Sequence, residues 1–596
     1  MSYPFTHFRP AVLLISGLAL LTLGPPTSTN RVRAQSNEMK LFPPPEVLML
    51  LENGSTGASE ALAASLGLVE ISGKARIGAS GHANSPKLGD IPVGATSNDE
   101  NEPTVVANPR DLKYLVAGSH SFAIGGQNRC VVYASNNGGA GWSAGVPMPQ
   151  LTATSSCSDP VVAYAPDGSR VYYSYMDIKN VQMGGPPNFT ITTDFDIVVS
   201  YSDDNGVTWS GPVVALDGDP YTVTVSPCPS PPFPPGSLCG VVTEPGYAFD
   251  KNWIGTHPDP GDRNWVYVTA TRFDTPGPSN IAFTHSSNSG LSYAAHQILD
   301  TGSTAAPGTL VQGSHPAGGP DGGVVVAWYH SGSDGIRNGT FQIRTRYSSD
   351  HGLPGTWESR VAAATDMSEA PFWLGPNTFY KRWWGTMFPD LAVDAGGMAH
   401  IVYTHDPVAN GVCTATGPSG PVVIPMCSSN PEDGDIRYIA SAGAPYDAWS
   451  RPLTVNDDGL PRAQGYPGLV TQHRGEASTV HIVWEDTRLS PDVPVSSIAG
   501  CFFVPVASAV CDSPNLYYDI FYARDVPGHG VGFFNNFRIS EVSSIQDFVF
   551  TGDYTDVAAN NRSVFGIWTD RRHQNTIFQG ADNVFGSRVI PGGGTP

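Results

Sequence analysis

The sequence repeats one short turn along most of its length, and this repeat constrains the fold more than any other feature. The clearest copy, at residues 202–209, reads Ser-Asp-Asp-Asn-Gly-Val-Thr-Trp. Substituted copies lie at residues 135–142, 286–293 and 348–357, and a fainter copy ends at Trp449. Apolar, aromatic-rich segments typical of strands precede the copies, so the pattern predicts a series of β-hairpins rather than helices.

The third position of the turn carries a short carboxylate or amide: Asn137, Asp204, Asn288 and, in the copy with two additional residues, Asp350. Such a side chain can accept hydrogen bonds from backbone N–H groups, and the glycine two residues later adopts positive φ without a Cβ clash. The aromatic residue that ends the turn is expected to pack in the seam between neighbouring sheets. We therefore expect these four residues to stabilise the fold and to take no part in chemistry.

The repeated turn is similar to the Asp box, and residues 101–589 resemble the sialidase-like, or BNR-repeat, β-propeller superfamily. The resemblance implies an all-β propeller of four-stranded antiparallel blades, with each box on the outer strands and remote from the ligand face. Sialidases of this superfamily are sixfold and carry an early Phe/Tyr-Arg-Ile-Pro motif. The nearest match here, residues 537–540, lies late in the chain and lacks the proline. The resemblance therefore does not extend to exo-sialidase activity.

A unit of two predicted strands recurs seven times after residue 100. Its opening strands begin near residues 101, 158, 250, 312, 388, 465 and 552, and apolar second strands follow, for example at 171–174 and 481–484. This count favours seven blades, with six as the alternative. The seventh unit is short, so we expect the N-terminal segment to supply its outer strand and to remove exposed edges.

The N-terminus is typical of an export signal. An apolar run at 11–23 follows Arg9 and precedes a Val-Arg-Ala cleavage site, so residues 1–34 are predicted to be a signal peptide. The run is short for a bilayer span, although an uncleaved anchor is the alternative. We expect residues 35–98 to form a partly flexible leader and residues 99–592 to form the propeller. The mature chain is then secreted and has no membrane span.

Composition agrees with an extracellular all-β protein. Gly 66 and Pro 53 with 14% charged residues suit short strands joined by long loops. The net charge of -21 disfavours nucleic acid and anionic membranes as partners. The eight cysteines are neighbours in sequence, and proximity alone predicts four disulfides. The predicted pairs are Cys130 with Cys157, Cys228 with Cys239, Cys413 with Cys427, and Cys501 with Cys511.

Charged loops are expected to converge at one end of the central channel. The loops that lead into the inner strands carry Glu102, Asp159, Asp250, Lys251, His315, Asp390, Asp553 and Tyr554. A glycosidase needs an acid, a base or nucleophile, and guanidinium groups that hold an anionic sugar. Our catalytic candidates are Arg272, Arg488, Arg571, Asp250, Asp553 and Tyr554. The alternative is that Asp486 with Arg488, and Asp570 with Arg572, brace neighbouring blades, because both pairs belong to a repeated Trp-x-Asp-x-Arg motif.

Substrate-binding candidates are Glu102 and the aromatic, basic insertion that contains Arg382, Trp383 and Trp384. Flat aromatic faces could stack on sugar rings, or the insertion could bury its own aromatic side chains. The oxygen-rich segments 98–102 and 430–435 could hold structural calcium, although neither has the EF-hand spacing and both could be solvated loops. No other metal and no cofactor is expected.

Two functional hypotheses follow from the sequence. In the first, the protein binds or hydrolyses extracellular carbohydrate at the loop-rich end of the channel. In the second, it is a noncatalytic extracellular binding or surface-assembly propeller, as the missing early arginine motif and the substituted later boxes suggest.

Overall fold

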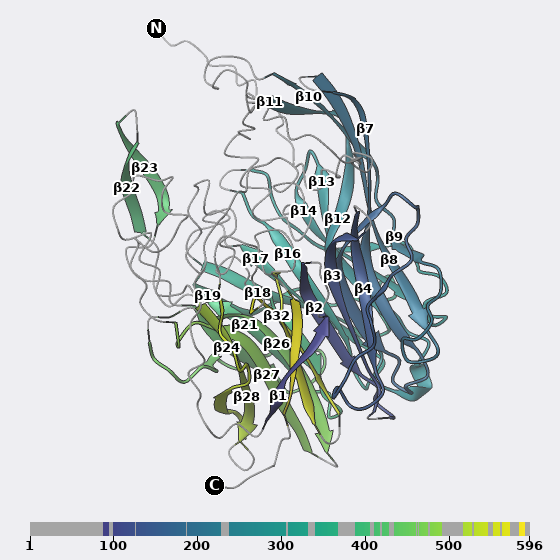
Figure 1. The fold of residues 1–596 in the computed structure, drawn as a ribbon, viewed down its shortest axis with the longest axis vertical. Helices are drawn as coiled ribbons and strands as arrows, with labels where there is room; N and C mark the ends of the chain where they lie inside the picture. Colours follow the sequence, from purple (N-terminus) through teal and green to yellow (C-terminus); the bar gives the residue numbers. More distant parts are fainter. Residues whose placement is uncertain are drawn as a thin grey trace, which may run out of the picture.

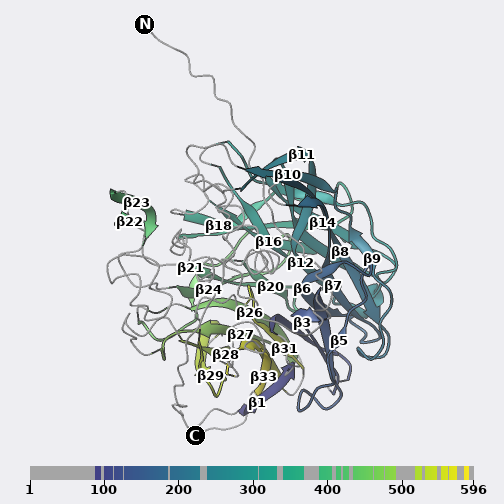
Figure 2. The ribbon, with the colours of Figure 1, turned by 45° about the horizontal axis from the view of Figure 1, so that its top comes forward.

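The computed structural model contains seven antiparallel sheets arranged as blades around a common axis (Figure 1, Figure 2). The inner strands β2, β6, β12, β16, β20, β26 and β31 each contact the next, and β31 returns to β2. The predicted all-β propeller with seven blades is therefore confirmed. The structure describes residues 87–589 except 95–98, 112, 125–126, 186–187, 228–237, 306–307, 332–339, 368–387, 406–410, 418–419, 428–433, 461, 463, 475–476, 491–516, 527–529, 546–551, 561–562 and 573–582.

The first four blades follow one another along the chain. Blade I contains β2 (Glu100–Ala107), β3 (Leu115–Ile124), β4 (Gln127–Ser135) and β5 (Val146–Pro147). Blade II contains β6 (Ser156–Tyr164), β7 (Val171–Gly185), β8 (Asn188–Ser202) and β9 (Val213–Leu216). Blade III contains β12 (Gly246–Thr256), a 3-10 turn η1 (Pro260–Asp262), β13 (Val266–Thr275), β14 (Ser279–Ser286) and β15 (Gln297–Thr301). Blade IV contains β16 (Val311–Gly318), β17 (Val324–Ser331), β18 (Thr340–Ser348) and β19 (Val361–Met367).

The last three blades have the same order. Blade V contains β20 (Asp390–Val393), β21 (Ala399–His405), β24 (Asp435–Ser441) and β25 (Leu453–Thr454). Blade VI contains β26 (Gln464–Arg474), β27 (Ala477–Asp486), β28 (Tyr517–Val526) and β29 (Gly530–Arg538), and the short β30 (Ser544–Ile545) also pairs with β28. Blade VII contains β31 (Asp556–Ala559), β32 (Val564–Asp570), β33 (Asn583–Val589) and β1 (Lys87–Gly94).

The N-terminal strand closes the ring, as the short seventh unit predicts. β1 pairs antiparallel with β33, and Figure 2 shows the violet β1 beside the yellow β33. Part of the predicted leader is thus the outermost strand of blade VII. The predicted signal peptide, and the leader before residue 87, lie outside the described residues.

Two hairpins extend beyond the regular blades. β7 and β8 are each 15 residues long, and β10 (Tyr221–Pro227) and β11 (Leu238–Glu244) continue the sheet from β8. β22 (Gly411–Gly417) and β23 (Gly420–Cys427) form a separate hairpin between β21 and β24. Both extensions project from the ring in Figure 1.

Three of the four Asp-box turns have the predicted hydrogen bonds from backbone N–H groups to the third side chain. The Asp204 carboxylate accepts hydrogen bonds from the backbone N of Val207 (3.1 Å) and of Thr208 (2.8 Å). Asn137 accepts from Gly141 N, and Asn288 accepts from Ser292 N. In the fourth copy, the Ser348 hydroxyl accepts from Gly352 N, while Asp350 lies at the same turn position.

The aromatic residue of the box packs in the seam between blades. Trp142 of blade I lies 5.4 Å from Phe565 of blade VII, and Trp357 of blade IV lies 4.9 Å from Phe283 of blade III, both measured between ring centroids. The fainter fifth copy is also a box-like turn, because Trp449 Nε1 donates to the Tyr446 carbonyl at 3.0 Å. These rings bury apolar area between neighbouring sheets and so stabilise the ring.

Side chains at one repeated position of the inner strands join neighbouring blades. Each accepts a hydrogen bond from the backbone N–H of the next inner strand. The four pairs are Thr104 with Val162 (3.3 Å), His315 with Leu391 (3.4 Å), Asp390 with Leu469 (2.5 Å) and Asp556 with Val105 (2.8 Å). The last pair links blade VII to blade I, so side-chain hydrogen bonds as well as β1 close the ring.

Candidate channel site

Five of the seven inner strands, β2, β6, β12, β16 and β26, carry a bulge at an equivalent position. Glu102, Asp159, Lys251 and Tyr466 have φ of 53°, 52°, 52° and 52°, in the left-handed region that favours glycine. The strand register shifts at each of these positions, as expected for a bulge. Left-handed conformations of non-glycine residues cost about 1–3 kcal/mol each and concentrate at functional sites.

Three of these bulges and the segment just before β31 bring together five buried side chains from four blades. Glu102, Asp159, Lys251 and Asp553 are each less than 5% exposed, and Tyr554 is 8% exposed. The Lys251 ammonium lies 3.9 Å from the centroid of the Tyr554 ring. Asp159 accepts hydrogen bonds from Ser158 Oγ (2.9 Å) and from the backbone N of Lys251 (3.1 Å). We call these five residues the channel cluster.

The electrostatics of the channel cluster favour a protonated Glu102. Burial raises the pKa of Glu102 well above its usual range, and the nearby carboxylates of Asp159 and Asp553 raise it further. Lys251 acts in the opposite direction. A carboxyl group kept protonated by burial and by neighbouring carboxylates is a common basis for the acid role in enzymes.

Tyr554 is held in place by its hydroxyl group. The hydroxyl donates to the Pro160 carbonyl at 2.9 Å. Burial raises the pKa of Tyr554 well above its usual range, and the carboxylates of Glu102 and Asp159 add to this effect. The environment therefore disfavours the phenolate that a tyrosine nucleophile would need.

A small cavity of about 30 Å³ lies against the channel cluster. Lys251, Tyr554 and Asp553 line it together with Trp253, His315, Phe388, Asp390 and Tyr466. His315 Nδ1 lies 2.7 Å from Asp390 Oδ1, and the His315 ring lies 4.6 Å from the Trp253 ring between centroids. One water molecule needs about 10–15 Å³ of such space, so the cavity has room for about two.

The predicted arginines lie outside this cavity and are engaged in other contacts. Arg272 Nε donates to Asp274 at 2.7 Å, and its guanidinium lies 4.3 Å from the centroid of the Tyr247 ring. Arg488 bonds Asp486 and Asp457. Arg571 is buried. Asp250 is also buried, and its Oδ1 accepts from the backbone N of Lys251 next to the channel cluster.

The Trp-x-Asp-x-Arg motif has the same geometry in blades VI and VII. Trp484 Nε1 donates to Asp486 at 2.8 Å, and Trp568 Nε1 donates to Asp570 at 3.0 Å. In both copies the arginine that follows bonds the aspartate and lies over a phenylalanine ring at about 4 Å. Arg572 also pairs with Asp90 of β1, so this contact ties the closing strand to blade VII.

Several predicted residues lie where the structure allows no statement about their side chains. Arg382, Trp383 and Trp384 lie outside the described residues, as do residues 430–433 of one oxygen-rich segment. The Cys130–Cys157 disulfide is confirmed, with a Cα–Cα distance of 5.5 Å. For Cys228, Cys239, Cys413, Cys427, Cys501 and Cys511 the side chains lie outside the described set.

Within the described residues, no group of three or more His, Cys, Asp or Glu side chains has the geometry of a metal site. The same part of the chain contains no helix that is long and apolar enough to cross a bilayer.

Sequence reasoning named Asp159 and Lys251 in the loops that lead into the channel but did not select them as site residues. A repeated signal accompanies three of the bulges: Glu102, Asp159 and Tyr466 each precede a proline at the same position of an opening strand. Phe388 also precedes a proline but is not left-handed. Nothing in the spacing indicated that these positions would be left-handed.

No protein-family model matches the sequence, and no curated protein matches it significantly. Among solved structures, the chain is similar to an α-L-arabinofuranosidase from Fusarium graminearum, with 9% identity, 85% of this chain and 98% of that chain covered, and a TM-score of 0.39. It is also similar to a Hadza microbial sialidase, with 12% identity, coverage of 81% and 74%, and a TM-score of 0.36. An ulvan lyase is similar with 8% identity, coverage of 84% and 95%, and a TM-score of 0.39. Similarities this distant carry no argument about activity.

Proposed function

We propose that this propeller processes carbohydrate at its central channel, with Glu102 as a proton donor and Asp159 as its partner carboxylate. The observation that carries the proposal is the channel cluster itself, in which buried Glu102 faces Asp159 and Asp553 on strained backbone. A carboxyl group kept protonated near neutral pH can donate a proton to a leaving oxygen. Glycosidic bond cleavage commonly uses such a group opposite a second carboxylate.

The surroundings of the channel cluster suit a sugar. The rings of Trp253 and Tyr554 meet edge to face beside the cavity, with 5.6 Å between their centroids, and aromatic rings pack well against apolar sugar faces. The cavity has space for water, so the proposal places the sugar at its mouth and the reacting water inside.

In this proposal, Arg272 and Arg488 brace the scaffold, because each is already paired with a carboxylate. Asp250 and Asp553 support the charges of the channel cluster. Arg382, Trp383 and Trp384 remain candidates for contacts to the distal part of a glycan. The Cys130–Cys157 disulfide is typical of an oxidising compartment, which is consistent with export of a sialidase-like protein.

The test is release of sugar from sialosides and from neutral and acidic polysaccharides by the purified protein. Glu102→Gln and Asp159→Asn should each lower turnover about 10²–10⁴-fold if they act in proton transfer. Glu485→Gln is the matched control, because Glu485 is also a buried carboxyl whose pKa is raised by burial, but it lies on the second strand of blade VI. Equal turnover in Glu102→Gln and the wild type would contradict the assignment.

The second candidate is a noncatalytic carbohydrate-binding propeller. The size of the cavity favours it, because about 30 Å³ cannot admit a sugar ring. A glycan array separates the two: binding without release of product, and unchanged by Glu102→Gln, is the result expected of a binding protein.

A further inference from the structure

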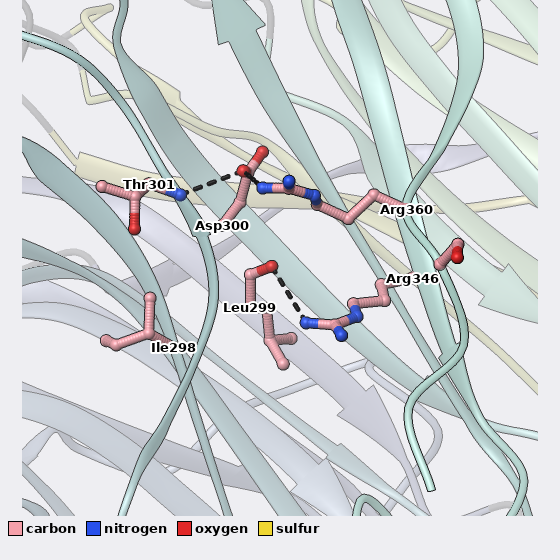
Figure 3. Close-up of a pocket in the computed structure, with 7 residues that line it drawn as sticks. Ile298, Leu299, Asp300, Thr301, Arg346 and Arg360 are labelled. Carbon is pink, nitrogen blue, oxygen red and sulfur yellow. Dashed lines mark hydrogen bonds and ion pairs between the residues drawn. The ribbon is translucent and has the colours of Figure 1, made fainter. Parts of the chain in front are cut away.

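A larger pocket lies on the outer strands at the seam of blades III and IV (Figure 3). Its volume is about 520 Å³, within the range of about 300–1,000 Å³ that is typical of small-ligand sites. β15 of blade III supplies one wall, and Arg346 of β18 with Arg360 just before β19 supplies the other.

The pocket carries a surplus of positive charge. Asp300 is its acidic lining residue, and its buried carboxylate accepts from Trp328 Nε1 (3.0 Å), Arg344 Nη1 (3.0 Å) and Arg360 Nη1. Arg346 instead donates to the carbonyl oxygens of Leu299 (3.2 Å) and Glu358 (2.8 Å). The guanidinium groups of Arg344 and Arg360 thus share one carboxylate, and Arg346 has no carboxylate among these contacts. Burial together with the charge of Arg360 lowers the pKa of Arg346.

In the Trp–Asp–Arg motif of blade VI, carboxylates outnumber arginines. Arg488 faces the carboxylates of Asp486, Asp457 and Asp458. A brace between blades therefore does not require excess arginine. In blade IV, the indole of Trp328 and the guanidinium of Arg344 both donate to one oxygen of Asp300. These two contacts already join the blades, so Arg346 and Arg360 are not required for the brace.

Both surplus arginines retain hydrogen-bond donors that face the pocket. Among contacts between described residues, Arg360 uses Nη1 alone, and Arg346 uses Nε and Nη1. Arg360 is 49% exposed, and Figure 3 shows both guanidinium groups reaching toward β15 across the pocket. Planar guanidinium forks match the oxygens of sulfate and phosphate groups and are weakly hydrated, which favours partly buried ion pairs.

We propose that this pocket binds an oxyanion group, a sulfate or phosphate, through Arg346 and Arg360. The group is either a free inorganic ion or an ester on a glycan. Because the whole chain has a net charge of -21, such a ligand is attracted by this local arrangement rather than by the general surface. The site is independent of any chemistry in the channel.

The test is calorimetric titration of the full-length protein with sodium sulfate, with sodium phosphate and with a heparin-derived tetrasaccharide, all at constant ionic strength. Arg360→Gln should weaken binding about tenfold or more, because a charge-assisted hydrogen bond is lost. Arg360→Lys keeps the charge but loses the planar fork and should have an intermediate effect. Arg263→Gln is the control, since Arg263 is similarly exposed (58%) and pairs with Asp167 elsewhere.

Binding of the inorganic ions that is weakened in Arg360→Gln, with the Arg263→Gln variant unchanged, supports a free-ion site. Binding of the tetrasaccharide alone, with the same dependence on Arg360, supports an ester on a glycan. The proposal is wrong if no probe binds the wild type, or if Arg360→Gln and Arg360→Lys bind as tightly as the wild type. Thermal unfolding without ligand verifies that each variant is folded.

Discussion

The packing of the Asp-box glycine against the preceding blade predicts which of two neighbouring glycines is essential. Gly352 and Gly355 lie in the same turn of blade IV and both have positive φ, 76° and 88°. A Cβ at Gly352 would lie 2.3 Å from carbons of the Phe283 ring in blade III, whereas a Cβ at Gly355 meets no atom within 4 Å. Substitution by alanine therefore separates the cost of backbone conformation from the cost of seam packing.

The two costs have different sizes. A left-handed alanine costs about 1–2 kcal/mol, and both variants should lose that much. Gly352→Ala should lose about 1–3 kcal/mol more, because Phe283 is buried and packs edge-on against Trp357 and so has little room to move. Urea unfolding followed by tryptophan fluorescence, with the two midpoints compared at equal slope, measures the difference.

A double-mutant cycle with Phe283→Leu identifies the source of the extra loss. If the added methyl meets the Phe283 ring, the two substitutions together should cost less than the sum of their separate effects. Equal losses in Gly352→Ala and Gly355→Ala, or strict additivity with Phe283→Leu, would refute seam packing as the reason for glycine at position 352.

Three further outcomes are expected. Asp556→Ala should lower the unfolding free energy by about 1–3 kcal/mol, because it leaves the buried N–H of Val105 at the ring closure without its acceptor, and an unchanged thermal midpoint would contradict this. The pKa of Asp196 is raised to about 7, chiefly by burial, so the folded state binds this proton more tightly than the unfolded state. Stability should therefore fall as pH rises from about 4 to about 7. Asp196→Asn should reduce this pH dependence of the thermal midpoint. Cys130→Ser should lower stability by roughly 3.5 kcal/mol, since the disulfide with Cys157 closes a loop of 27 residues, and urea unfolding should show the same loss in Cys157→Ser.

The parts of the fold that follow from local chemistry could be predicted from the sequence. The box around Asp204 predicts a hairpin because its carboxylate, glycine and tryptophan are close in sequence and act within one turn. Counting the recurring pairs of strands predicted seven blades, and the short last unit indicated that the N-terminal segment would complete it. Each inference required only alternation of apolar residues and turn preferences.

The extensions and the bulges could not be predicted in this way. β10 pairs with the first part of β8, at the end away from the Asp box, and β11 pairs with β10, so both strands lengthen blade II. No local sequence pattern distinguishes these two strands from an ordinary loop. The left-handed conformation of Glu102 depends on the ring around it, because the same Glu-Pro pair in an isolated strand favours extended backbone.

The roles of the charged motifs also needed the three-dimensional structure. Asp570 and Arg572 have the spacing of a catalytic pair and of a brace alike. The indole of Trp568 belongs to the same motif and bonds Asp570. The ring of Phe585 and Asp90 of β1 contact Arg572 and come from other strands, and Asp90 lies at the opposite end of the chain. Sequence spacing therefore identified a pair that could be catalytic or structural, but it could not show which residues contact the pair.

The channel cluster has an energetic cost that the scaffold alone does not explain. Glu102, Asp159, Lys251 and Tyr466 occupy equivalent bulges at φ near 52°, where glycine or asparagine would be less strained. Three of these positions also bury an acidic or basic side chain, and removing a polar or charged group from water costs free energy. Blade IV makes the same bulge with Gly313 at φ 65°, so the propeller can be built without a charged side chain at this position. Backbone strain and buried ionisable groups coincide at these positions although Gly313 shows a less strained alternative, and this coincidence supports the proposed role of the channel cluster.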